Sequence, residues 1–98
     1  MRDLNLTFSA ELWMYHGKGA WHFITLPEED SEQIKFLSSQ ERRGWGSVRV
    51  TASIGQTTWK TSVFPDTKAG AYLLPVKAEV RKKEKIEAGN LVTVTLKF

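Results

Sequence analysis

Cysteine is absent from this sequence of 98 residues. Its absence excludes a disulfide framework, a thiolate nucleophile and a zinc site built from cysteine, and it fits a reducing cytoplasm. Long apolar runs are also missing: no window approaches the length of a membrane span, and the opening residues lack the apolar core of a signal peptide. We therefore expect a soluble cytoplasmic protein that has no membrane partner.

Catalytic motifs are equally scarce. The two histidines, His16 and His22, have no neighbouring histidine or paired carboxylate at the spacing that a metal ion or a general base needs. No serine lies in a G-x-S-x-G elbow, and the glycine patterns that bind phosphate groups are missing. The acidic run from Glu28 to Glu32 fits a solvated helix start better than a cation site. We expect no enzymatic activity, no metal and no cofactor.

The segment from Val48 to Phe64 has the clearest structural pattern. Two alternating stretches flank Gly55-Gln56, and Gly55 can adopt the positive φ that the first central position of a type II′ turn requires. A two-residue loop then pairs Ile54 with Thr57 and, at the far end, Val48 with Val63. This register predicts one polar face and one core face. The core face would hold Val48, Val50, Ala52, Ile54, Trp59 and Val63.

Alternation also runs from Leu4 to Tyr15, which predicts a long, half-buried strand. His16-Gly17-Lys18-Gly19 supplies turn residues after it. The returning segment, Ala20 to Leu26, carries large residues on both parities, so we expect a strand that is buried on two faces, as in a closed barrel. The two strands would form a hairpin rich in aromatic residues.

The remaining segments complete a single domain over residues 1–98. Acidic residues after Pro27, with Ile34 and Leu37 three positions apart, predict a short helix over Glu28–Ser38. The other expected elements are a loop over 39–45, a strand over Ala71–Leu74, a helix over Val76–Lys83 and a final strand over Leu91–Phe98. The fold class is therefore all-β: a small closed β-barrel of about six strands with one or two short helices.

Three ordered blocks extend over nearly the whole chain. They read A-E-L-W-M-Y with A-W-H-F-I-T-L-P, then R-V-T-A-S-I-G-Q-T-T-W-K-T-S-V-F-P-D, then Y-L-L-P-V-K-A-E-V-R-K-K followed by I-E-A-G-N-L-V-T-V-T-L. In these blocks the chain resembles the bacterial domain-of-unknown-function 1905 family. The resemblance implies a small closed β-barrel of unestablished activity, joined in some members to a domain described as associated with bacteriocin protection. Members tend to carry Asp where this chain has Asn90; both residues tolerate turn geometry, so the fold should be unchanged.

The formal net charge is +3, and the cations are unevenly distributed. Five of them lie within the nine residues 77–85, in and just after the second expected helix: Lys77, Arg81, Lys82, Lys83 and Lys85. Lys77 and Arg81 share one helical face. The pattern fits a solvated helix surface, but it also fits an anion-binding site formed by Lys77, Arg81, Lys82 and Lys83. The stretch further looks like the strand, helix and glycine turn of swapped-hairpin DNA-binding antitoxins, which are much shorter chains that must dimerise.

Aromatic residues offer a different kind of site. Trp13, Tyr15, Trp21 and Trp45 could line a ligand pocket or stack on nucleobases. Trp59 could do the same, but it shares a face with aliphatic residues, which favours packing in the core. We therefore interpret the protein as a non-enzymatic binding or interaction module, with nucleic-acid or anion binding by the helix around 77–85 as the alternative. The partner stays open between a small ligand, a protein and a polyanion, and we expect a monomer or a weak dimer.

Overall fold

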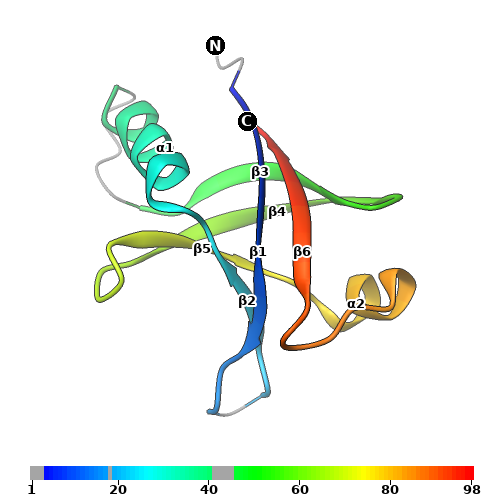
Figure 1. Ribbon diagram of the computed structural model, residues 1–98. Helices are drawn as coiled ribbons and strands as arrows, with labels where there is room; N and C mark the ends of the chain where they lie inside the picture. Colours follow the sequence, from blue (N-terminus) through cyan, green and yellow to red (C-terminus); the bar gives the residue numbers. More distant parts are fainter. Residues whose placement is uncertain (1–3, 18, 41–45) are drawn as a thin grey trace.

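The computed structural model describes residues 4–17, 19–40 and 46–98, and its strands form one closed barrel (Figure 1). The strand order is β1-β2-β5-β4-β3-β6, and the neighbouring strands pair antiparallel. The elements are β1 (Asn5–Met14), β2 (His22–Thr25), α1 (Glu28–Gln40), β3 (Val48–Ile54), β4 (Thr57–Asp66), β5 (Ala71–Pro75), α2 (Ala78–Glu84) and β6 (Leu91–Lys97). This architecture confirms the predicted all-β barrel with two short helices.

Aliphatic side chains that alternate along the strands fill the barrel. Along β1 the inward residues Leu6, Phe8 and Leu12 are buried, and along β6 every second residue from Val92 to Leu96 is buried. Inward residues of neighbouring strands are direct partners, as in Phe8 opposite Val94. Burial of these side chains, at roughly 25 cal/mol per Å² of apolar surface, is the main force that stabilises the barrel. The alternation predicted for the first and last strands is confirmed.

The β3–β4 hairpin has the predicted register. Ile54 pairs with Thr57, and Val48 pairs with Val63 at the other end. Gly55 has a φ of 58° whereas Gln56 keeps a negative φ, which is the type II′ pattern. Trp59 packs against the core as expected, but its side chain is only partly buried. The hairpin therefore presents one large aromatic residue to solvent as well as to the core.

The structure corrects the prediction for the returning strand after the first turn. β2 is shorter than Ala20–Leu26, and only its inward parity, Ile24 followed by Leu26, is fully buried. On the outward parity Trp21 is 57% exposed and Phe23 is partly buried. The expectation of burial on two faces was wrong because a strand in a single-layered barrel has one inward face, and no second layer of described residues covers the outside of β2.

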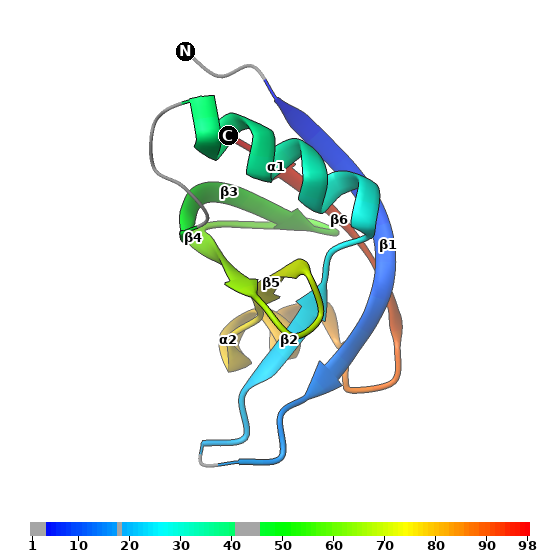
Figure 2. The same ribbon diagram turned by 90° about the vertical axis from the view of Figure 1, so that its left-hand side faces the viewer.

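The helices lie on opposite sides of the barrel (Figure 1 and Figure 2). α1 begins at Glu28 as predicted and extends to Gln40, so that the first part of the expected loop over 39–45 is helical. Its Ile34 is fully buried in the core, and the hydroxyl of Ser31 accepts the backbone N–H of Tyr72 at 3.0 Å. Partial burial, reinforced by the adjacent Glu29, raises the pKa of the Asp30 carboxyl above its ordinary value. Neither helix of the described chain is long and apolar enough to cross a membrane.

α2 begins later than the predicted Val76. Lys77 is the N-cap in extended conformation, and Lys85 ends the helix with a left-handed φ of 55°. Val76, just before the helix, and Val80, within it, are 2% and 1% exposed. The two valines therefore face the core as predicted, although only one of them belongs to the helix. The backbone N–H of Val76 donates to the carbonyl of His22 at 2.9 Å, so Val76 stays paired with β2 and the helix begins after it.

Glu84 attaches the C-terminal end of α2 to the β3–β4 turn. Its carboxylate Oε2 accepts the backbone N–H of Gln56 at 3.2 Å and the hydroxyl of Thr57 at 2.6 Å. Hydrogen bonds to a charged acceptor are stronger than neutral ones. This carboxylate therefore couples a helix to a turn that lies 27 to 28 residues earlier in the chain.

Replacement of Glu84 by alanine should lower the free energy of unfolding by about 1 to 2 kcal/mol, because two donors at the turn lose their charged acceptor. Urea denaturation measures this change. The matched control is Glu87→Ala, which removes an exposed carboxylate of the same chain and should change stability by less than about 0.5 kcal/mol. Equal effects of the two substitutions would show that the Glu84 contacts contribute nothing.

Candidate ligand-binding cleft

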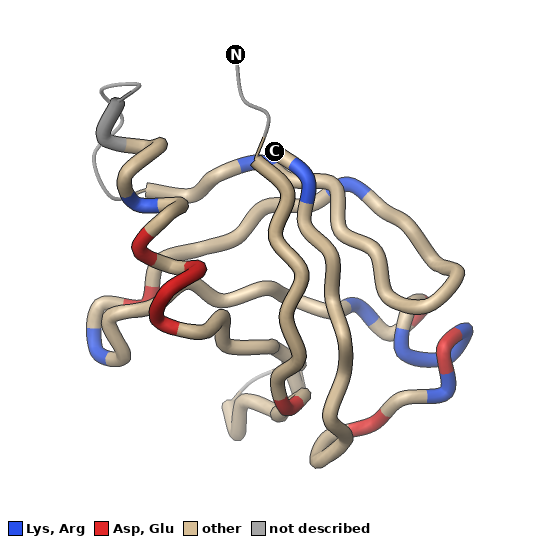
Figure 3. Tube along the Cα trace, turned by 45° about the horizontal axis from the view of Figure 1, so that its top comes forward, with Lys and Arg blue, Asp and Glu red and all other residues tan. Residues whose placement is uncertain are grey.

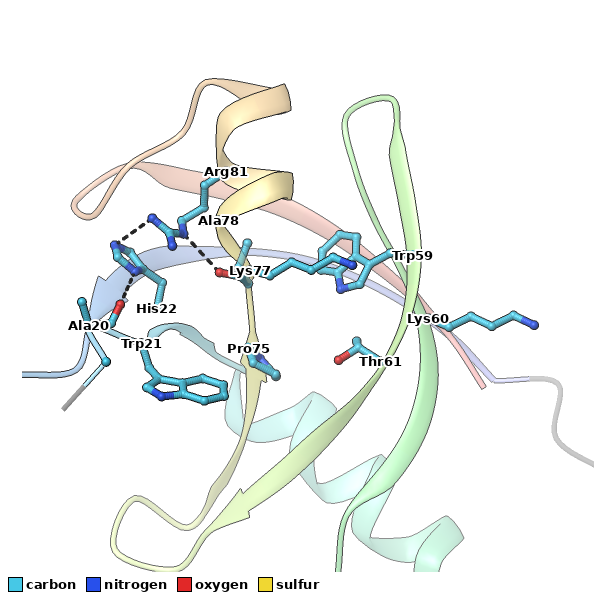
Figure 4. Close-up of a pocket in the computed structure, with 12 residues that line it drawn as sticks. Ala20, Trp21, His22, Trp59, Lys60, Thr61, Pro75, Lys77, Ala78 and Arg81 are labelled. Carbon is cyan, nitrogen blue, oxygen red and sulfur yellow. Dashed lines mark hydrogen bonds between the residues drawn. The ribbon is translucent and has the colours of Figure 1, made fainter. Parts of the chain in front are cut away.

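A cleft of about 390 Å³ opens between the first hairpin and α2 (Figure 4). The hairpin contributes residues 19–22, β4 contributes residues 59–61, and the segment from Pro75 to Arg81 closes the third side. Its cationic or titratable lining residues are His22, Lys60, Lys77 and Arg81. Among the described residues that line the cleft, none is acidic. The cleft therefore has a positive electrostatic character.

Arg81 is fixed in place by the residues around it. Its Nε–H donates to the carbonyl of Val76 at 3.2 Å, and its Nη1 lies 3.4 Å from Nε2 of His22. A guanidinium can only donate, so Nε2 of His22 is the acceptor and Nδ1 carries the proton. Nδ1–H then donates to the carbonyl of Ala20 at 2.9 Å. The chain of contacts ties α2 to the first hairpin and leaves further guanidinium N–H groups for a ligand.

Two tryptophans stand on opposite sides of the cleft. Figure 4 shows the rings of Trp21 and Trp59 with Pro75 between them. Trp21 is 57% exposed, and Trp59 is partly buried against the core. Aromatic rings and proline offer flat apolar surfaces without competing charges. The cleft thus combines apolar walls with cations.

Ala20, at the mouth of this cleft, has an unusual backbone. Its φ of 44° lies in the left-handed region, which an alanine seldom adopts. Strained conformations of this kind cluster at functional sites. The hydrogen bond from His22 to its carbonyl holds the peptide in this orientation.

The predicted anion-binding set of Lys77, Arg81, Lys82 and Lys83 is divided by the structure. Lys77 and Arg81 line the cleft, and Lys77 extends towards Trp59 (Figure 4). Lys82 and Lys83 do not line it. The ammonium groups of Lys77 and Lys83 lie 3.8 and 3.6 Å from the carboxylate of Glu79, in exposed ion pairs of small energetic value. Figure 3 shows the resulting mixture of basic and acidic segments on α2.

The predicted aromatic set is brought together in a neighbouring groove of about 830 Å³. Trp13, Tyr15 and Trp21 all line it, and Phe23 lies between the two tryptophan rings at centroid distances of 5.3 and 6.1 Å. Trp13 is anchored by a hydrogen bond from Nε1 to the hydroxyl of Thr25 at 2.9 Å. Trp45 lies outside the described residues.

Comparison with known sequences decides the family. Residues 8–96 match the model of the domain of unknown function DUF1905. The chain belongs to the DUF1905 family. No curated protein matches the chain.

Asn90 lies in the turn before β6. The side-chain oxygen of Asn90 accepts the backbone N–H of Glu87 at 2.9 Å, and Gly89 has a φ of 100°. An amide oxygen can accept this N–H, as a carboxylate oxygen can. The turn therefore forms with asparagine, as expected from its tolerance of turn geometry.

Several residues of the cleft were missed by the sequence analysis. His22 was assigned no partner because Arg81 lies 59 residues later in the chain. Trp59 was assigned to the core, and Lys60 and Thr61 were not considered. The shared inward parity of Trp59 and Thr61 was visible in the sequence, but the opening beside them depends on where α2 docks. Among the described residues, no group of three acidic, histidine or cysteine side chains could hold a metal ion.

Proposed function

We propose that this DUF1905 protein is a non-enzymatic binding module whose ligand is a small organic anion, held in the cleft between the first hairpin and α2. One observation carries the proposal: two tryptophans and two cations, Lys77 and Arg81, line the same cleft, and no acidic residue is among its described lining. We place this activity in the bacterial cytoplasm, which the lack of cysteine supports.

Arg81 is the expected anchor of the anion. Its contacts with Val76 and His22 fix the guanidinium before any ligand arrives, so that little side-chain entropy is lost on binding. Arginine presents several N–H groups in a rigid fork that matches carboxylate and phosphate oxygens. Lys77, which is exposed and pairs with Glu79, adds a second positive charge from the same side of the cleft. Together these residues would select for negative charge.

The tryptophans are expected to select for shape. Trp21 and Trp59 face the cleft from opposite sides, and Pro75 lies between them. A planar, apolar group can pack against such surfaces, whereas a compact hydrated anion cannot use them. The volume of about 390 Å³ lies at the lower end of small-molecule sites, which supports a ligand of one or two rings.

The cleft also supports binding in preference to a reaction. Its described lining holds one hydroxyl, on Thr61, and one imidazole, on His22, whose two nitrogens both have partners within the protein. General acid–base chemistry usually requires a group that is free to exchange its proton with the ligand. The imidazole therefore acts here as a positioning group for Arg81.

The test is a titration with benzoate and with a nucleoside monophosphate, followed by calorimetry or by tryptophan fluorescence. The double variant Lys77→Gln, Arg81→Gln should bind at least about tenfold more weakly, since two charged donors are removed. The matched control is Lys82→Gln, Lys83→Gln, which removes the same charge from α2 outside the cleft and should leave affinity within about twofold. Benzamide, the neutral analogue of benzoate, should not bind. Equal losses in both double variants would contradict the proposal.

A second candidate function, polyanion binding, is favoured by the position of Lys60. Lys60 lines the cleft but points away from it (Figure 4), and it also lines a shallow depression with Arg49 and Lys97. Lys60 and Lys97 are the partners of Thr51 on either side of β3. The cations thus continue from α2 around the outside of the barrel, along a path that a nucleic-acid backbone could follow.

Ionic strength separates the two candidates. Binding to single-stranded DNA or heparin through several phosphate or sulfate contacts would weaken steeply with added salt, whereas binding of one small anion would weaken little. The charge-reversed variant Lys77→Glu, Arg81→Glu should abolish either interaction. The variant Arg49→Gln, Lys97→Gln should weaken only the polyanion. A protein that passes through a heparin column at low salt would rule out the second candidate.

A further inference from the structure

The cleft and the aromatic groove are continuous. Trp21 and Pro75 line both of them, so that the two depressions share a wall and a floor. From this shared boundary the groove passes over the outer surfaces of β1, β2, β5 and β4, where Trp13, Phe23, Phe64 and Leu73 line it. A ligand in the cleft can therefore extend into the groove without leaving the protein surface.

The groove concentrates exposed apolar surface. Tyr15 is 53% exposed, Trp21 57% and Phe64 45%, and all three line it. Large apolar side chains gathered in one patch mark interaction sites on soluble proteins, whereas single exposed ones need no explanation. The indole N–H of Trp13 and the carboxylate of Asp66 already have partners within the protein. The groove thus offers mainly apolar contact.

We infer that the ligand is amphipathic: an organic anion whose charged group occupies the cleft and whose apolar body lies along the groove. This inference rests on the proposed function and names its ligand class more narrowly. Charge complementarity sets the orientation, because Lys77 and Arg81 are at the cleft end. The groove lining holds one charge of each sign, Lys68 and Asp66, and otherwise consists chiefly of aromatic rings and prolines. An apolar body that covered the groove would remove its exposed rings from water, which is favourable in proportion to the area buried.

A homologous series of phenylalkanoates tests the inference. Phenylacetate, phenylbutyrate, phenylhexanoate and phenyloctanoate carry the same charge and differ only in the reach of the apolar body. Affinity measured by calorimetry should increase about twofold for each added methylene. This corresponds to roughly half of the free energy gained when a methylene is fully buried, because the groove is open on one side. The increase should stop once the chain is longer than the groove.

Two variants assign the effect to the two parts of the site. Phe64→Ala should abolish the dependence on chain length and leave the affinity for phenylacetate unchanged, since Phe64 lines only the groove. The matched control is Phe36→Ala, which removes an exposed aromatic ring from α1, away from the groove, and should change neither quantity. Lys77→Gln with Arg81→Gln should weaken every member of the series by the same factor.

The possible outcomes distinguish failure of this inference from failure of the proposed function. If phenylacetate binds but affinity does not rise with chain length, the groove plays no part and the inference is overturned, while the proposed function stands. If no member binds at millimolar concentration, both are overturned. If the matching phenylalkanols bind as tightly as the acids, the groove takes apolar molecules without an anionic group, and the cationic cleft is not the anchor.

Discussion

Valine in place of Gly55 is expected to lower the free energy of unfolding by about 2 to 4 kcal/mol. Gly55 has a φ of 58°, in a region that residues with a side chain avoid and β-branched residues avoid most. A Cβ atom at this position would also overlap the carboxylate of Glu84. The substitution therefore strains the type II′ turn and displaces the side chain that attaches α2 to it. Urea denaturation monitored by circular dichroism measures the loss.

Gly70 provides the matched control for this prediction. Its φ of 69° is similar, but a Cβ atom there would meet nothing within 4 Å. Gly70→Val therefore carries the backbone penalty alone, and Gly55→Val should be the more destabilising of the two. In a Glu84→Ala background the extra cost at Gly55 should disappear. If the two valine variants are equally stable, the carboxylate of Glu84 moves aside freely and the attachment of α2 is unimportant.

Alanine in place of Trp59 should affect stability and binding together. The side chain packs against the core and also forms one wall of the cleft. We expect a loss of about 2 to 3 kcal/mol in the free energy of unfolding, below the value for a fully buried tryptophan, because part of the ring is exposed. Affinity for benzoate should fall about tenfold, because one of the two aromatic walls is removed.

Trp21 separates these two effects. It lines the same cleft but is 57% exposed, so Trp21→Ala should weaken binding while changing stability by less than about 1 kcal/mol. Trp59→Phe, which keeps an aromatic ring in place, should restore most of the stability. If Trp59→Ala leaves benzoate affinity unchanged while stability falls, the ring serves only the core and the cleft is not the binding site.

The elements that the sequence predicted best are those set by local chemistry. A two-residue turn at Gly55 fixes the pairing of every residue in the β3–β4 hairpin, so its register could be derived and was confirmed. The alternation along β1 and β6 likewise shows which residues face inward. The four-residue spacing of Val76 and Val80 predicted a helix that starts at Val76. Burial alone could not correct this, because both valines are buried although only Val80 belongs to the helix.

The cleft could not be predicted in the same way, because it forms where α2 and the segment before it pack against the first hairpin and β4. His22 and Arg81 are 59 residues apart, and nothing near either residue indicates the other. Whether Lys82 or Lys77 faces a cavity depends on how α2 is rotated against β4. The aromatic groove was easier to predict, since Trp13, Tyr15 and Trp21 belong to one hairpin and a hairpin places its two strands side by side.

The two attachments of α2 have a consequence for how the protein would respond to the proposed ligand. Arg81 joins one side of this seven-residue helix to His22, and Glu84 joins its end to the β3–β4 turn. A helix this short does not persist in water on its own, so its structure and its docking are one equilibrium. A ligand that contacts both Lys77 and Arg81 would bind only the state in which α2 is docked. Ligand binding would therefore shift the docking equilibrium of α2 towards the docked state. The β3–β4 turn, which does not line the cleft, is thereby linked thermodynamically to ligand affinity, and occupancy of the cleft would be transmitted to the opposite end of the helix.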